Sequence, residues 1–482
     1  MVFNSYIFLL LFLPCLILSY YILVKVFDNR KQYALSGLLL IASAIFYSYT
    51  NTDYLLLLYI SILINYLLYC TILKRKEKHK TTKGILIFGI IINFSILLYF
   101  KYINFAIQSI NIILGSDFAI REISIPLGIS FITFQQIAFL VDVYRGEISG
   151  CSFCDYSLFI TYFPHVSSGP ILLHGDFLHL LGKVQKLNWD KFATGIYFFV
   201  MGLGKKVIIA DTFAKAVDWG YANIAELNST SAIFVSVAYS IQIYFDFSGY
   251  SDMAIGISRM LQLDLPINFN SPYKAKNILE FWKRWHMTLT RFLTKYLYIP
   301  LGGNRKGKVR TYINTLIVFL CSGIWHGASW TFIIWGLLHG IFMVFTKLFQ
   351  KQIERIPNII NHVGTLFFVN FTWILFRSGT FDTFRQIMRA ILQNKWGGLN
   401  ENISSAFRPS ILNLFGNINM PNWIFPVMST MMILAVVLKC ENVQEQIVSL
   451  KYSKATAIWV VLIAVVSILS LSGVNTFIYS IF

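Results

Sequence analysis

Long apolar stretches alternate with short polar ones along most of this chain. A tilted helix needs about 17 to 25 mostly apolar residues to cross a bilayer, and many of these stretches approach that length. The pattern predicts an all-α polytopic membrane protein with about ten to thirteen helices, some of the short pieces being re-entrant. The apolar stretches are residues 6–24, 35–49, 54–73, 85–100, 123–143, 192–209, 232–245, 312–324, 329–345, 366–376, 423–438 and 457–481.

Composition supports this class of protein. Of 482 residues, 56% are hydrophobic and only 13% are charged, whereas a soluble domain carries about 25% charged residues. The mean hydropathy is +0.63. We expect a single integral membrane domain over 1–482, with N-terminal helices in 1–122, a core in 123–348 and C-terminal helices in 349–482.

The distribution of charge predicts the orientation of the chain. The net charge is +18, and basic residues follow the first apolar stretch and, at 74–83, the third, whereas the turn expected at 51–53 has none. By the positive-inside rule, the N-terminus lies outside and both basic loops are cytoplasmic. The first stretch has neither the basic start nor the cleavage motif of a signal peptide, so we expect it to remain as a helix. Nucleic-acid binding is a poor explanation for the charge.

A basic block at 274–310 contains ten Lys or Arg residues and one acid, Glu280. We expect it to face the cytoplasm. Within it, 280–296 has the period of one amphipathic helix, which would lie at the membrane interface or dip into the protein. Pro300 and the following glycines should end it. His286 shares a flank with apolar residues and should point inward. The apolar stripe consists of Phe281, Trp285, Leu289, Phe292 and Tyr296.

His326 is the leading candidate for chemistry. It lies between Gly323 and Gly327 and between two apolar stretches, where an ionisable group is costly to bury. A neutral imidazole there can accept the proton of a hydroxyl, which is the task of a general base in acyl transfer. The alternative is a histidine that only hydrogen-bonds between helices.

The other histidines and the cysteines are weaker candidates. His286 has the alternative of filling an amphipathic surface, and His339 fits an interhelical hydrogen bond. His174 and His179 are five residues apart, off a common helical face, and Cys151 and Cys154 form a lone C-x-x-C pair. We predict no metal site from either pair.

Two carboxylates, Asp246 and Asp252, occur with four hydroxyls at the end of an apolar stretch. They could orient an imidazole or satisfy the backbone by hydrogen bonding. The motifs of serine hydrolases, P-loop nucleotide hydrolases and zincins are missing from the sequence. Serine-hydrolase, nucleotide-hydrolysis and zincin chemistry therefore lack their usual signals here.

A series of motifs occurs in a fixed order along the chain: IPLGISF at 125–131, YFPH at 162–165 with SGPI at 168–171, YFDFSGYSD at 244–252, NFNSPY at 268–273, FWKRWH at 281–286, LGGNR at 301–305 and GIWHGA at 323–328. This ordered series resembles the membrane-bound O-acyltransferase (MBOAT) family, in particular its bacterial AlgI-like branch of alginate O-acetylation proteins. The resemblance is dense from residue 126 to 340 and loose in the flanking helices.

The resemblance implies an MBOAT-like bundle around a central tunnel with an active-site histidine near its middle. The invariant histidine of the family falls on His326, and its second, less strictly required histidine falls on His286. The branch implies transfer of acetyl from cytoplasmic acetyl-CoA, a substrate rather than a bound cofactor, to a polysaccharide exported from a bacterial cell. An extracytoplasmic partner of the SGNH-hydrolase type and a location in the cytoplasmic membrane are implied as well.

The basic block fits this scheme in one of two ways. Lys283, Arg284 and Arg291 could attract the phosphates of the acyl donor. The same cations could instead anchor the chain to anionic lipid in the bilayer.

Three other functions stay open at this point. The fold could transfer D-alanine to teichoic acid, as in the DltB branch. The chain could be a transporter or pore that moves a glycan or an acyl carrier without making bonds, or a scaffold for a soluble acetyltransferase.

Overall fold

A computed structural model describes residues 1–27, 31–181, 187–408, 421–471 and 477–478. Helices are its regular elements, and no strand occurs in these residues. Four segments, η1, η2, η3 and η6, are π-helical, and η4 and η5 are single 3₁₀ turns. The elements are η1 (Phe8–Phe12), α1 (Leu13–Val26), α2 (Lys31–Glu77), α3 (Lys83–Leu97), η2 (Leu98–Tyr102), α4 (Ile103–Leu114), α5 (Ile129–Arg145), α6 (Phe153–Thr161), α7 (Phe163–Val166), α8 (His174–Leu181), α9 (Trp189–Gly204), η3 (Lys205–Ala210), α10 (Asp211–Ala222), η4 (Ile224–Glu226), α11 (Ser229–Met260), η5 (Pro272–Lys274), α12 (Ile278–Arg284), α13 (Met287–Leu293), η6 (Thr294–Tyr298), α14 (Gly307–His326), α15 (Trp330–Leu348), α16 (Gln350–Ile353), α17 (Asn358–Ser378), α18 (Phe381–Leu392), α19 (Glu401–Ser405), α20 (Ile424–Lys439), α21 (Val443–Val448) and α22 (Lys454–Leu469).

The prediction of an all-α polytopic membrane protein is confirmed. Seven helical segments in the described part of the chain are long and apolar enough to span a membrane, two of them, 32–49 and 52–77, within α2, and α20 and α22 are shorter apolar helices. The seven are fewer than predicted because α11 and α14 meet the length but mix polar and charged residues into their sequences. The expected central tunnel stays a prediction.

Three boundaries differ from the sequence prediction. α2 continues through residues 51–53, where we expected a turn, so two apolar stretches form one helix of 47 residues. α5 begins only at Ile129 because its N-cap residue, Gly128, has a left-handed backbone with φ of 69°. The residues from 123 to 128 therefore lie outside the helix. α22 ends at Leu469, well before residue 481.

The chain forms two compact units. Of the described residues, those within 1–199 and 250–266 belong to the first unit, and those within 200–249 and 267–478 belong to the second. α9 and α11 contribute to both. The predicted division at residues 122 and 348 stays a prediction.

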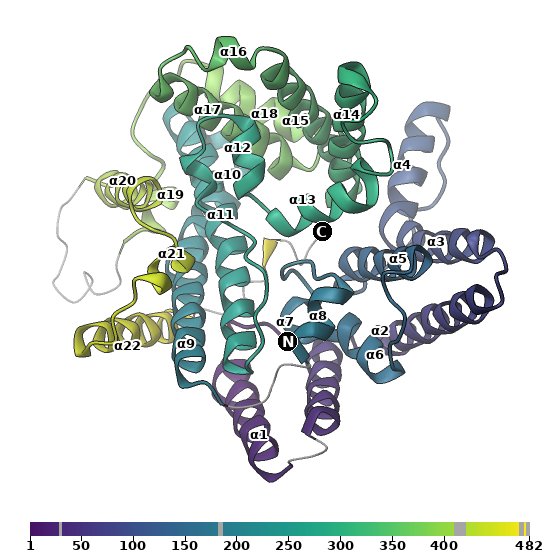
Figure 1. Ribbon diagram of the computed structural model, residues 1–482. Helices are drawn as coiled ribbons and strands as arrows, with labels where there is room; N and C mark the ends of the chain where they lie inside the picture. Colours follow the sequence, from purple (N-terminus) through teal and green to yellow (C-terminus); the bar gives the residue numbers. More distant parts are fainter. Residues whose placement is uncertain (28–30, 182–186, 409–420, 472–476, 479–482) are drawn as a thin grey trace. The chain divides into compact units, whose positions relative to one another are not determined.

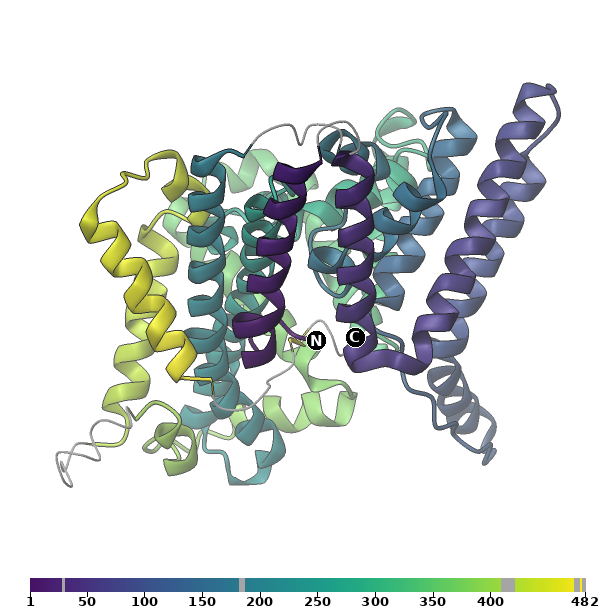
Figure 2. The same cartoon turned by 90° about the horizontal axis from the view of Figure 1, so that it is seen from below.

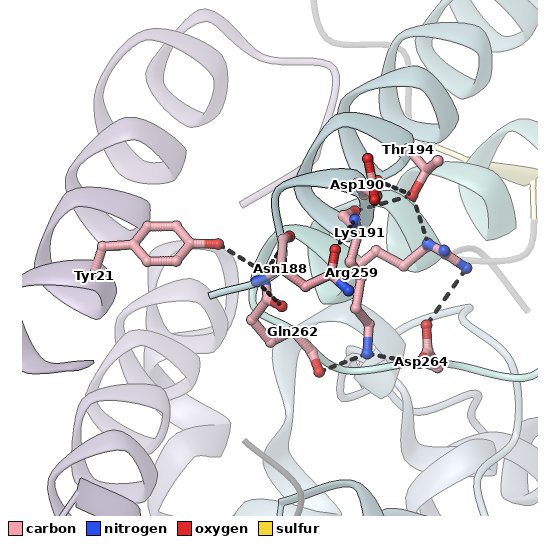
Figure 3. Close-up of polar contacts among 8 residues, drawn as sticks. All are labelled: Tyr21, Asn188, Asp190, Lys191, Thr194, Arg259, Gln262 and Asp264. Carbon is pink, nitrogen blue, oxygen red and sulfur yellow. Dashed lines mark hydrogen bonds and ion pairs between the residues drawn. The ribbon is translucent and has the colours of Figure 1, made fainter. Parts of the chain in front are cut away.

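In the first unit, α2 packs on α3 and α6, and α3 packs on α5; the long α2–α3 pair is the dark blue hairpin in Figure 2. A polar cluster ties the start of α9 to the end of α11 (Figure 3). There Lys191 and Arg259 both pair with Asp264, at 2.6 and 3.4 Å. Gln262, in the left-handed region with φ of 63°, bonds the backbone N–H of Asn188. These contacts fix the register of two helices that continue into the second unit.

In the second unit, α14 and α15 form a close antiparallel hairpin, drawn in green in Figure 1. A Cβ on Gly323 would lie 2.3 Å from the carbonyl oxygen of Phe332, and one on Gly336 would lie 2.4 Å from that of Phe319. Only glycine permits this approach, as at other close helix contacts in membranes. The hairpin therefore holds the end of α14 tightly against α15.

Candidate active site

His326 is the last residue of α14 and is 2% exposed. The backbone becomes extended at Gly327, and α15 then begins at Trp330 with Ser329 as its N-cap. A Cβ on Gly327 would lie 2.2 Å from the ring of Phe332. The glycine after His326 thus allows the Phe332 ring to come close, and the helix end places the imidazole inside the second unit.

Aromatic rings surround the His326 imidazole. Trp335 from α15 meets it edge-on at 5.1 Å between centroids, and Phe376 from α17 does so at 5.4 Å. Its neighbour Trp325 lies at 5.0 Å. Apolar walls of this kind exclude water, which strengthens every electrostatic interaction inside them.

His286 lies at a break between α12 and α13. Its φ of 45° and ψ of 52° are left-handed, so the single helix predicted for 280–296 is wrong. Backbone bonds from a neighbouring loop enter the break: Met287 N–H donates to Asn268 at 2.9 Å, and Asn270 N–H donates to Arg284 at 2.9 Å. The predicted inward direction of His286 is confirmed, because the residue is 0% exposed.

The hydrogen bonds of Asn268 fix the tautomer of His286. Asn268 Oδ1 accepts from the backbone N–H of Thr288 at 3.2 Å and from its hydroxyl at 2.9 Å. A backbone N–H can only donate, so the atom at this position is the amide oxygen. His286 Nδ1, 3.1 Å from the same oxygen, must therefore carry a proton. Burial lowers the pKa of His286 to about 3, so the neutral ring has its lone pair on Nε2.

The two histidines share one enclosure. Their ring centroids are 6.5 Å apart at an angle of 55°, and Trp325 lies next to both rings. Phe247 from α11 closes the other face of His286, edge-on at 4.8 Å. This arrangement brings together two of the residues that the sequence singled out and gives one of them a defined basic nitrogen.

The three predicted donor-binding cations have different surroundings. Lys283 and Arg291 have exposed side chains. The half-buried Arg284 donates to Glu280 Oε1 from two nitrogens, at 3.0 and 2.8 Å, and to the carbonyl of Asn270 at 3.1 Å. Arg284 therefore fastens α12 to the Asn268–Asn270 loop, and binding of donor phosphates by the three residues stays a prediction.

The carboxylate of Asp246 bonds a lysine, not an imidazole. Its Oδ1 lies 2.6 Å from Nζ of Lys206, which also pairs with Asp211 at 2.9 Å, and its Oδ2 accepts from Ile478 N–H. Lys206 belongs to the π-helical segment η3 and is 2% exposed. Sequence reasoning missed this ion network, although a lysine inside the apolar stretch 192–209 was a signal for it.

His339 is an interhelical hydrogen-bonder, as predicted. Its Nδ1 accepts from the indole N–H of Trp282 on α12 at 3.2 Å, and its Nε2 lies 3.0 Å from the Thr372 hydroxyl on α17. That hydroxyl in turn donates to the carbonyl of Val369. Because the Thr372 hydroxyl proton goes to Val369, Nε2 of His339 must donate to that hydroxyl oxygen, while Nδ1 accepts from Trp282. Both ring nitrogens are thus engaged in bonds between helices, so this imidazole has a structural role.

The remaining histidine and cysteine candidates lie in the first unit. His165 bonds Gln135 and the carbonyl of Phe159, and His174 Nε2 lies 3.2 Å from Cys151 Sγ. The side chain of His179 lies outside the described residues. No group of three His, Cys, Asp or Glu side chains arranged for a metal occurs among the residues that the structure describes.

Replacing Asn268 by aspartate should make activity sensitive to acid. A carboxylate beside Nδ1 stabilises the imidazolium and raises the pKa of His286, typically by about 1 to 3 units. Because Nε2 loses its lone pair on protonation, kcat/KM should fall as pH drops through the raised pKa. We expect an additional loss of up to about tenfold between pH 8 and pH 5 in this variant relative to wild type.

The matched control is Thr288→Val, which removes a hydroxyl donor from the same oxygen without adding charge. Its pH profile should follow wild type. An Asn268→Asp profile that coincides with wild type over this range would contradict the assigned role of Asn268.

Comparison with known proteins adds a family match and three relatives. Residues 3–377 match the sequence model of MBOAT, the membrane-bound O-acyltransferase family. The chain is 39% identical over 423 residues to the peptidoglycan O-acetyltransferase of Helicobacter pylori, covering 81% of this chain and 80% of that protein. It is 39% identical over 384 residues to the probable alginate O-acetylase AlgI of Pseudomonas aeruginosa, covering 78% and 72%. The teichoic acid D-alanyltransferase of Bacillus subtilis is 28% identical over 277 residues, covering 53% and 69%.

Proposed function

This chain belongs to the membrane-bound O-acyltransferase family, and we propose that it transfers acetyl from cytoplasmic acetyl-CoA to hydroxyl groups of an exported polysaccharide. The observation that carries the proposal is the pair of buried imidazoles, 6.5 Å apart in one aromatic enclosure. An acyl transfer needs a base for the hydroxyl proton and little else that is charged. The chain is a multi-pass membrane protein, and we place it in the cytoplasmic membrane of a bacterium.

In the proposed reaction, His326 is the general base and His286 assists it. His326 removes the proton of the acceptor hydroxyl as its oxygen attacks the thioester carbonyl, forming a C–O bond. The C–S bond then breaks, and the departing coenzyme A sulfur takes up the proton. His286, with its proton held on Nδ1 by Asn268, assists through Nε2. Lys283 and Arg291 are the candidates for contacts with the donor phosphates.

The relatives support acetyl over D-alanine as the transferred group. The two relatives at 39% identity are named as acetylating enzymes, whereas the D-alanyltransferase is 28% identical over a shorter stretch. Glycans and serine side chains both present the hydroxyl that this reaction needs. We propose that an extracytoplasmic SGNH-type protein relays the acetyl group to the glycan.

The test is transfer of label by purified protein in lipid nanodiscs. With acetyl-labelled acetyl-CoA, the extracytoplasmic partner and either deacetylated alginate or peptidoglycan strands, we expect free coenzyme A thiol and base-labile acetyl ester to form together. The same measurement with a D-alanyl thioester should give at least about tenfold less ester, by analogy with discrimination through one or two contacts. Absence of both products with acetyl-CoA, in protein that remains folded and with the extracytoplasmic partner supplied, would favour a transporter or scaffold.

A further inference from the structure

The second unit contains a cavity of about 450 Å³ outside the histidine enclosure. One wall is a face of the helix formed by α9, η3 and α10, and the opposite wall is made by α20 and α22; these are the teal and yellow helices side by side in Figure 2. The lining is mostly apolar, and its size is that of a small-molecule site. The apolar residues that line it include Ile208, Met432, Ile433, Val437, Trp459 and Ile463.

The cavity is elongated along the helices. On one wall the lining residues run from Met201 to Thr212 and on the other from Ser429 to Cys440. At 1.5 Å per residue, each wall extends about 17 Å. The hydrocarbon core of a bilayer is about 30 Å thick, so the cavity matches the thickness of one leaflet, which is the depth of one lipid chain.

The outer faces of the two helices that form one wall are apolar. On α20, Met428 and Met431 are both 64% exposed, and Val461 on α22 is 60% exposed. In a multi-pass membrane protein, an extended apolar outer face of this kind lies against lipid. A chain entering the cavity therefore comes from the membrane.

One end of the cavity is polar. Glu441, Asn442 and Gln446 line it there together with Ser271, and Nζ of Lys274 bonds the carbonyl of Cys440 at 2.7 Å. Lys274 begins the basic block whose sequence predicts a cytoplasmic location. A phosphate at this end would meet the ammonium of Lys274 and the amides of Asn442 and Gln446, beside the carboxylate of Glu441, while the hydrocarbon of the lipid would follow the apolar walls.

We propose that this cavity binds a glycerophospholipid of the cytoplasmic leaflet, with one acyl chain between α20, α22 and the η3 helix and the phosphate beside Lys274. The site is separate from the acetyl-transfer reaction. Tyr244 lines the cavity, and its ring packs on Phe269 and Trp285, the layer behind the His286 break. The bound chain therefore buttresses that layer from the membrane side.

Photolabelling tests the site directly. Full-length protein is reconstituted in vesicles of phosphatidylethanolamine with phosphatidylglycerol that carries a diazirine midway along one chain. After irradiation, we expect labelled peptides to contain Ile433 or Val437, which are 7% and 8% exposed and line the cavity. Label confined to outward residues such as Met428 and Met431 would overturn the proposal.

The second measurement is the amount of phospholipid retained by variants in which a larger side chain fills the cavity. Val437→Trp should lower the phospholipid retained on detergent-purified protein, counted by native mass spectrometry, by about fivefold or more relative to Val461→Trp, which adds the same ring on an exposed position. Ile433→Phe is the milder filling variant if Val437→Trp does not fold. Equal retention in folded filling and control variants would also overturn the proposal.

Discussion

Replacing His326 by alanine is expected to lower the rate of acetyl transfer by about 10² to 10⁴, the usual contribution of general acid–base catalysis. The substitution removes the imidazole at the end of α14 but leaves the glycine contacts of the α14–α15 hairpin unchanged. No water can replace the base readily, because Trp335 and Phe376 enclose the position. The measurement is the initial rate of ester formation in nanodiscs, together with ester acetate on the cell-surface polymer.

The matched control is His339→Gln. It alters another fully buried imidazole, one that bridges α12 and α17, and a glutamine amide can both donate and accept. We expect a lower thermal stability in detergent but at least about a tenth of wild-type activity, because a neutral bridge of this kind contributes about 1 kcal/mol per hydrogen bond. Wild-type ester acetate with His326→Ala present in the membrane at normal amounts would show that the imidazole is not the base and would favour a transporter.

The period of apolar residues predicts where helices occur better than where they end. The stretch 329–345 became α15 within a few residues, because a continuous apolar helix needs only local hydrogen bonds. The break at His286 could not be predicted from 280–296, whose period continues without interruption. It depends on backbone bonds from Asn268 and Asn270, which lie more than ten residues earlier in the chain.

The same limit applies to the site. His326 could be found from its cost in an apolar stretch and His286 from its flank, and the family motifs placed both. The aromatic surroundings of the two imidazoles could not be predicted from the sequence. Phe247 on α11 and Phe376 on α17 contact the imidazole rings only in the folded chain. The motif at 268–273 contained Asn268, but an asparagine after an apolar stretch reads as a turn residue until its partners are seen.

Removal of the His286 imidazole is the second large expected effect. The backbone there is left-handed, which asparagine tolerates better than most residues with a side chain, so His286→Asn removes the ring with little strain. We expect kcat to fall by about 10 to 10² with KM changed less than threefold, since an assisting base acts on the transition state more than on bound substrate. Steady-state kinetics with acetyl-CoA varied at saturating acceptor separates the two constants.

The double variant decides whether the histidines act as a unit. Groups that serve one proton transfer lose their effects together, so their free-energy losses do not add. If His286 assists His326 across the 6.5 Å between their rings, then His326→Ala combined with His286→Asn should be no more than about threefold slower than His326→Ala alone. A full further loss of 10- to 10²-fold in rate would mean that His286 acts independently of His326, for example on the leaving sulfur. The two histidines would then have separate roles in spite of their shared enclosure.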